Sequence, residues 1–393
     1  MKRIDNKTAW IMWSIPTLFY ALVWVLRVAP GILKNDIMDY YGIDALKFSL
    51  IPAFYYAGYA SMQIPVSFSM DRFKLNKVMA ILMIATGVGL VLLSRAFWFP
   101  LAVFGCFIIG AGTTVSVLGS SNIINSNFHK HSYSFMFGLT LTSGLFAGAC
   151  AGKIISMVTS YFNWQSFYML ATIFCIVLAI AALSLIKTSR KHAQKSNFSL
   201  RTVTAFILKD KFVILLALFS GFMTGPMQGF ADVWGLGFLS KSLGFERSTA
   251  IFINSLCFLG YGIGAPIIGK MAQKYDLLKE SLVTCGIVMA LSFLTILFVP
   301  NLGSASIGTL LFLSGLGSAY PPLTFAIALH STKKEFGNVA IGISNMILMI
   351  FGSVYHTLIG LLYTTSPTLG ISIIPLGVII GTIGTIFIFW KKR

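Results

Sequence analysis

Twelve long apolar runs follow one another along this chain of 393 residues, and they constrain its fold more than any other feature. A helix of about 20 mostly apolar residues is long enough to cross the hydrocarbon core of a bilayer. The runs lack the strict alternation of apolar and polar residues that a membrane β-barrel needs, so helices must satisfy the backbone in lipid. We therefore predict an all-α integral membrane protein with twelve transmembrane helices at 10–33, 48–70, 75–94, 99–120, 133–156, 163–186, 212–238, 249–272, 280–299, 304–328, 337–363 and 368–390.

The composition excludes the common soluble classes. Hydrophobic residues make up 56% of the chain and charged residues only 10%, whereas a typical soluble domain has about 25% charged residues. A net charge of +18 would suggest a nucleic-acid partner in a soluble chain. Here the basic residues lie between the apolar runs, so we expect the lipid bilayer as partner and no nucleic acid. The five cysteines lie inside apolar runs without CxxC spacing, which predicts free thiols, no metal site and no cofactor.

The basic residues also predict the orientation of the chain. If the N-terminus is cytoplasmic, most of the 29 Lys and Arg residues fall in loops on the cytoplasmic side. This bias is the positive-inside rule, because basic loops are retained in the cytoplasm. We therefore predict a multi-pass protein of the cell inner membrane with both termini in the cytoplasm.

The chain divides into two similar halves. A basic segment at 187–211 separates six predicted spans from six others, which gives an N-terminal bundle at 1–186, a cytoplasmic linker at 187–211 and a C-terminal bundle at 212–393. When each position is compared with the one 202 residues later, short motifs coincide. Gly42-Ile43-Asp44 matches Gly244-Phe245-Glu246, Gly58-Tyr59 matches Gly260-Tyr261, and with a small slip Gly110-Ala111-Gly112 matches Gly315-Leu316-Gly317. These matches predict two pseudo-symmetric six-helix bundles.

With this layout the chain resembles the major facilitator superfamily (MFS) over essentially its whole length. The loop at 67–77 is the most specific local match to the family pattern G-x-x-x-D-R-x-G-R/K-R/K. Asp71 and Arg72 agree with the pattern, whereas Ser67 and Lys74 replace its two glycines. The resemblance implies alternating access, with the halves rocking around a midplane site, and a gating role for Asp71 and Arg72. The opening at 27–30 is similar to bacterial nutrient-uptake members, near the lysosomal dipeptide transporter branch.

Arg27 is the main candidate for substrate binding in the first half. A charge within a span is costly and marks a functional site by default. Tyr20, Trp24 and Arg27 have the spacing i, i+4, i+7 and so share one helix face. A guanidinium flanked by aromatic rings can bind a carboxylate through two hydrogen bonds. The alternative is an arginine that extends to the outer headgroups.

The second span carries a polar stripe of Tyr55, Tyr59 and Gln63 at i, i+4, i+8. We expect this stripe to face a water-filled cavity, or alternatively to pack against another helix. The eighth span repeats it with Asn254 and Tyr261.

Polar residues in the remaining spans complete the predicted binding site. Gln228 and Asp232 follow Gly225-Pro226 in the seventh span, where a break in the helix is expected. Asp232 could accept a substrate amine, carry a proton or pair with Arg27; the alternative is an acid at the outer interface. Tyr320 precedes two prolines that predict a kink. Asn345 and His356 share a face of the eleventh span, and His356 could titrate near neutral pH or serve a structural role.

These features predict a secondary active or facilitative transporter of a small polar organic solute, namely an amino acid, a short peptide or an organic acid. The expected partners are this substrate and protons, and the expected state is a monomer. An exporter of drugs or siderophore-like compounds is the alternative. The fifth span has Gly144, Gly148 and Gly152 where drug exporters carry a motif ending in Gly-Pro, but Lys153 follows here. An enzyme would need clustered catalytic groups, and the spans hold one histidine and very few carboxylates.

Overall fold

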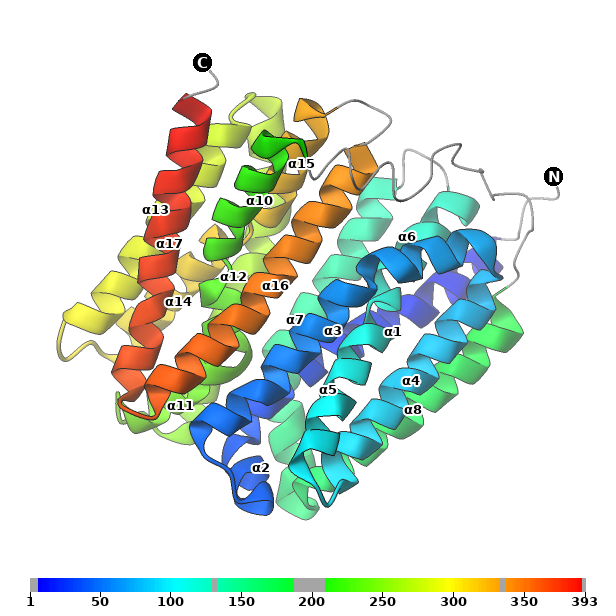
Figure 1. The fold of residues 1–393 in the computed structure, drawn as a ribbon, viewed down its shortest axis with the longest axis horizontal. Helices are drawn as coiled ribbons and strands as arrows, with labels where there is room; N and C mark the ends of the chain where they lie inside the picture. Colours follow the sequence, from blue (N-terminus) through cyan, green and yellow to red (C-terminus); the bar gives the residue numbers. More distant parts are fainter. Residues whose placement is uncertain (1–5, 129–132, 187–208, 333–336, 391–393) are drawn as a thin grey trace. The chain divides into compact units, whose positions relative to one another are not determined.

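The computed structural model describes residues 6–128, 133–186, 209–332 and 337–390, and these residues form helices without strands (Figure 1). Within this part of the chain, 11 helices are long and apolar enough to cross a membrane. The remaining predicted span, 48–70, lies in α3 (Ala45–Arg72), which is 28 residues long but more polar because it carries the tyrosine and glutamine stripe. Each of the twelve apolar runs therefore corresponds to a helix or to consecutive helices, and the predicted all-α fold is confirmed.

The described residues of the N-terminal half form eight helices, of which α2 lies between two predicted spans and was not predicted. Asn163 caps one of them by accepting a hydrogen bond from the backbone amide of Ser166 at 3.0 Å. The run at 99–120 was predicted as one helix, but it is interrupted at Thr114. The helices are α1 (Asn6–Ile32), α2 (Lys34–Tyr41), α3, α4 (Leu75–Arg95), α5 (Phe99–Thr113), α6 (Val115–Asn127), α7 (Tyr133–Tyr161) and α8 (Trp164–Leu185).

The C-terminal half contains two interrupted spans, as the glycine and proline pairs predict. The seventh span consists of α10 (Lys211–Phe222), the π-helix η3 (Gly225–Trp234) and α11 (Gly235–Lys241), with the break before Pro226. The tenth span breaks at Tyr320 between α14 (Ser304–Gly317) and α15 (Pro321–Ser331). The other helices are α12 (Arg247–Lys274), α13 (Leu278–Phe298), α16 (Gly337–Tyr363) and α17 (Pro367–Trp390).

The chain forms two compact units. The first unit comprises 1–29, 35–41 and 54–195, and the second comprises 30–34, 42–53 and 196–393. The second unit therefore includes two short pieces of the N-terminal half, at the end of α1 and the start of α3. The domain limits predicted from the sequence stay a prediction, because the linker at 187–208 lies outside the described residues.

Glycines bring α3 and α5 into direct backbone contact in the first unit. A Cβ atom added to Gly58 would overlap the carbonyl oxygen of Phe107, and one added to Gly110 would overlap that of Tyr55. Small residues at such crossings let transmembrane helices pack through their backbones.

The second unit repeats this crossing between α12 and α14. A Cβ atom at Gly260 would overlap the carbonyl oxygen of Phe312, and one at Gly315 would overlap that of Cys257. Gly260 is the residue that the sequence comparison pairs with Gly58, and Gly315 is paired with Gly110. The internal repeat thus corresponds to the same helix crossing in each unit.

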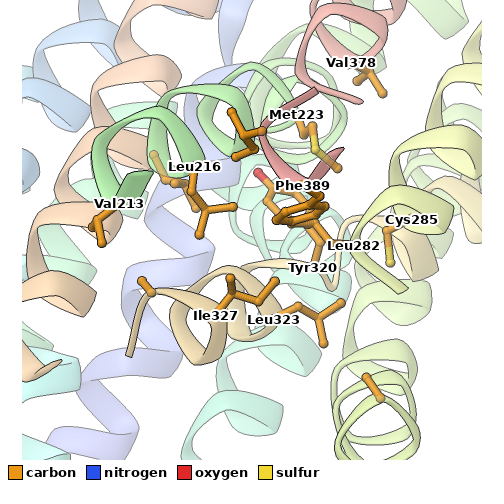
Figure 2. Close-up of a cluster of buried hydrophobic side chains, with 14 of the residues drawn as sticks. Val213, Leu216, Met223, Leu282, Cys285, Tyr320, Leu323, Ile327, Val378 and Phe389 are labelled. Atoms are coloured by element: carbon orange, nitrogen blue, oxygen red, sulfur yellow. The ribbon is translucent and has the colours of Figure 1, made fainter. Parts of the chain in front are cut away.

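The core of the second unit includes a cluster of buried apolar side chains from α10, α12, α13, α15, α16 and α17 (Figure 2). Its members are fully buried or nearly so, and they include Val213, Leu216, Met223, Leu282, Cys285, Tyr320, Leu323, Ile327, Val378 and Phe389. In lipid, dispersion and packing hold such helices together, since leaving the lipid tails gains no hydrophobic energy. This core fixes the helices that flank η3.

Candidate substrate-binding residues

The first unit gathers the predicted residues of α1 on one face, as their spacing requires. The rings of Tyr20 and Trp24 meet edge to face, with centroids 6.2 Å apart at 82°. The Cζ atom of Arg27 lies 4.1 Å from the centroid of the Trp24 ring. Both aromatic side chains are buried and Arg27 is half-buried. The predicted arrangement of a guanidinium flanked by aromatic rings is therefore present.

Tyr56 completes the surroundings of Arg27, and the sequence reasoning did not include it. The Nη2 atom of Arg27 donates a hydrogen bond to the Tyr56 hydroxyl at 2.5 Å. Tyr56 is only 2% exposed, although it neighbours the predicted stripe residue Tyr55. The stripe was chosen by helical spacing, and that spacing gives no signal for a residue on the adjacent face.

Along α3, the stripe residues differ in their contacts. The Tyr55 hydroxyl is buried and accepts a hydrogen bond from Thr113 at 3.3 Å, which agrees with the helix-packing alternative. Tyr59 is half-buried and Gln63, one turn further along α3, is buried. Both add polar groups to this helix beside the packing contact of Tyr55.

The glycine stripe of α7 contacts the aromatic face of α1. An added Cβ atom at Gly144 would lie 2.6 Å from the Nε1 atom of Trp24 and would also overlap the Tyr20 ring. The absence of a side chain at this position therefore allows both rings to pack directly on the α7 backbone. This contact fixes the orientation of the Trp24 ring, over which the Arg27 guanidinium lies.

In the second unit, the π-helix η3 presents the predicted residues Gln228 and Asp232, which are 6% and 1% exposed. The side chain of Asn254 on α12 donates a hydrogen bond to the carbonyl oxygen of Ala231 at 2.8 Å. A π-helix shifts the backbone hydrogen bonds of the surrounding turns, and Asn254 satisfies one of the carbonyls. The acceptor atoms Gln228 Oε1 and Asn254 Oδ1 are buried without a hydrogen-bond donor among the described residues.

His356 is fully buried on α16 and is held by a residue that the sequence reasoning missed. Its Nδ1 atom accepts a hydrogen bond from Trp234 Nε1 at 3.2 Å. Since Nδ1 is the acceptor, the ring carries its proton on Nε2 in this arrangement. The contact joins η3 to α16, which agrees with the structural role left open for this histidine.

Three further predicted residues lie on other helices of the second unit. The Tyr320 hydroxyl donates a hydrogen bond to the carbonyl oxygen of Ser220 at 2.7 Å, and so joins the break before α15 to α10. Tyr261 on α12 and Asn345 on α16 are half-buried. Substrate contacts stay a prediction for all of these residues.

Of the predicted gating pair, Arg72 is exposed at the end of α3. Its Cζ atom lies 3.9 Å from the centroid of the Phe68 ring. The Asp71 side chain lies outside the described part of the structure. The gate is therefore a prediction from the motif alone. In the described residues, no group of three or more His, Cys, Asp or Glu could hold a metal ion.

Comparison with known proteins agrees with this architecture. In Saccharomyces cerevisiae, the probable transporter MCH2 is 25% identical over 175 residues, which cover 42% of this chain and 36% of that protein. The chain thus spans about a third of the length of this relative.

Solved structures share the fold at low sequence identity. A bacterial homologue of the human lysosomal transporter Spinster, in an inward-facing unoccupied conformation, has a TM-score of 0.79 at 12% identity, covering 99% of each chain. The nucleoside transporter NupG has a TM-score of 0.78 at 14% identity, covering 97% of this chain and 100% of that one. The family model of the Major Facilitator Superfamily matches residues 13–235 and 230–393. This chain therefore belongs to the Major Facilitator Superfamily and is a multi-pass membrane transporter.

Proposed function

We propose that this transporter carries an amino acid, a short peptide or an organic acid across the inner membrane by alternating access. The observation that carries the proposal is the environment of Arg27. Its guanidinium lies on the Trp24 ring and donates a hydrogen bond to the Tyr56 hydroxyl. These two contacts hold the side chain in one orientation. A pre-oriented guanidinium binds a carboxylate with two parallel hydrogen bonds. The first unit thus offers a site for an anionic group.

The second unit offers the complementary chemistry. Gln228 Oε1 and Asn254 Oδ1 are buried acceptors that meet no donor in the described part of the chain, and the Asp232 carboxylate lies on the same π-helix as Gln228. A buried acceptor that lacks a donor costs about 1–3 kcal/mol. An N–H or ammonium group of a ligand would recover this cost. The second unit by itself thus suits the amine or amide group of an amino acid or a short peptide.

Coupling and orientation complete the proposal. Asp232 is a buried carboxylate within the seventh span, so we propose proton symport through it. We also propose that both termini are cytoplasmic, that Asp71 and Arg72 act at the cytoplasmic gate and that the transporter is a monomer. The six-helix halves at 1–186 and 212–393, joined by the basic linker, are the proposed moving bodies.

A ligand screen by thermal unfolding tests the substrate class, because a ligand that binds the folded state raises its apparent stability. Amino acids, dipeptides, carboxylates, nucleosides, sugars and hydrophobic drugs would be compared with purified wild-type protein. We expect stabilisation by carboxylate-bearing solutes and its loss in Arg27→Ala. Arg95→Ala is the matched control, because Arg95 is an exposed arginine at the end of α4. Stabilisation only by drugs would favour the exporter, and equal stabilisation of Arg27→Ala would exclude Arg27 from binding.

A further inference from the structure

Lys34, at the start of α2, lies in a cage of aromatic rings. Its Nζ atom is 3.8 Å from the centroid of the Tyr363 ring, 4.1 Å from that of Trp234 and 5.6 Å from that of Phe48. The side chain is only 8% exposed. All four residues belong to the second unit.

The rings of the cage are fixed by their own contacts. The centroids of Trp234 and Tyr363 are 4.9 Å apart, and Phe48 meets Trp234 edge to face at 5.8 Å. The indole of Trp234 is held by its hydrogen bond to His356. The cage is therefore a packed cluster of rings around the amine, and its three rings come from α3, η3 and α16.

The backbone that precedes Lys34 is held against the same elements. The carbonyl oxygen of Ile32 accepts a hydrogen bond from Arg247 Nη2 at 2.9 Å. An added Cβ atom at Gly31 would lie 2.6 Å from the Cα atom of Val233, so the chain touches the η3 backbone there. These contacts hold the backbone that precedes Lys34 against η3 and α12.

The cage suits an amine but gives it no counter-charge. In the described residues, neither a carboxylate nor a hydrogen-bond acceptor is found on Nζ, and the rings offer only their π-faces. Burial lowers the pKa of Lys34 to about 7, and the positive charge of Lys241 on α11 lowers it further in the same direction. Other charged or titratable groups on the elements that carry or surround Lys34 include Asp36 and Asp39 on α2, Lys47 on α3, Asp232 on η3, Arg247 on α12, and His356 and Tyr363 on α16; Asp44 precedes α3.

We propose that the ε-amine of Lys34 is a proton-binding site of this transporter, which takes up a proton when the cage of Phe48, Trp234 and Tyr363 opens and releases it when the cage closes. The proposal deepens the proposed transport function by naming a group through which pH acts on the protein, separate from Asp232. No other chemistry is involved, because the amine only gains or loses a proton.

The protonation equilibria set the size of the effect. An amine in water has a pKa of about 10.4, whereas the caged amine has a pKa of about 7. The proton therefore binds the open state more tightly than the closed one. Lowering the pH from about 8.5 to about 5.5 should favour opening by about 30-fold.

Amine acylation of the wild-type protein tests the proposal without any substrate. The protein in detergent is treated briefly with an N-hydroxysuccinimide ester between about pH 6 and 9.5, and peptide mass spectrometry gives the rate at each lysine. Only a neutral, accessible amine reacts, so an exposed lysine labels about tenfold faster per pH unit up to about pH 10. Lys47 is the matched control, because it is exposed on the same segment of the second unit.

We expect the Lys34 rate to level off above about pH 7, so that its ratio to the rate of an amine in water, such as Nα-acetyl-lysine added to the same sample, falls roughly 70-fold between pH 7.5 and 9.5. A Lys34 rate that rises about tenfold per pH unit over this range would overturn the proposal, because the amine would then titrate as in water. Absence of labelling at every pH would also overturn it, because the cage would not open. Since no solute is present, either failure is distinct from a failure of the proposed substrate class.

Discussion

Replacing Gly110 by alanine should force α3 and α5 apart and so destabilise the first unit. The new Cβ atom would overlap the carbonyl oxygen of Tyr55 and would lie 2.8 Å from its carbonyl carbon and 2.9 Å from the Tyr59 amide nitrogen. These atoms belong to a helix backbone, so they cannot rotate away as a side chain would. Overpacking of this kind typically costs about 1–3 kcal/mol. Because the helix that must move carries Tyr59, ligand binding should weaken as well.

The same substitution at Gly138 on α7 is the control, because nothing lies within 4 Å of a Cβ atom there. Alanine is favoured over glycine within a helix by about 1 kcal/mol, so Gly138→Ala should be neutral or stabilising. At roughly 2–4 °C per kcal/mol, we expect Gly110→Ala to lower Tm by several degrees in a thermal unfolding assay of purified protein. If both variants unfolded at the wild-type temperature, the backbone contact between α3 and α5 would be refuted.

Three further substitutions test single contacts. Lys34→Met should have a larger free energy of unfolding than wild type at pH 7. Between pH 7 and 9.5 the wild type should gain about 3 kcal/mol of stability relative to this variant, because the unfolded lysine binds a proton there that the caged lysine lacks. Thermal unfolding of both proteins at the two pH values checks this. Trp234→Phe should cost about 1–3 kcal/mol by leaving His356 Nδ1 without its donor, and a double-mutant cycle with His356→Phe measures that coupling. Asp232→Asn should abolish accumulation driven by a pH gradient but keep exchange in proteoliposomes; unchanged accumulation would remove Asp232 as the coupling residue.

The helices and their ends could be predicted from the sequence because the bilayer imposes a length and an apolar composition on each span. The breaks at Pro226 and Pro321 could be predicted as well, because a glycine precedes the first proline and a second proline follows the other, whereas the single Pro266 and Pro375 lie inside continuous helices. The interruption at Thr114 was not, because no proline marks it.

Local spacing predicted the α1 face of Tyr20, Trp24 and Arg27, whose mutual contacts depend on one helix alone. Contacts between different helices could not be predicted from the spacing of residues along one helix. Tyr56 and Trp234 both hold predicted residues, Arg27 and His356, across a helix interface. An extra aromatic residue in an apolar span gives no signal of this kind.

The π-helix η3 shows why the form of a break, unlike its position, depends on tertiary partners. Gly225-Pro226 only removes one backbone hydrogen bond. The π-helix that follows also needs residues of other helices as partners for its hydrogen-bonding groups. Asn254 does so on the Ala231 carbonyl, and His356 accepts from the indole at the end of the same turn. π-Helices occur often at functional sites because they re-aim side chains that an α-helix would place elsewhere. Here one such turn carries both Gln228 and Asp232 of the proposed amine site and the Trp234 ring that covers Lys34, so solute recognition and proton binding would share a single local distortion.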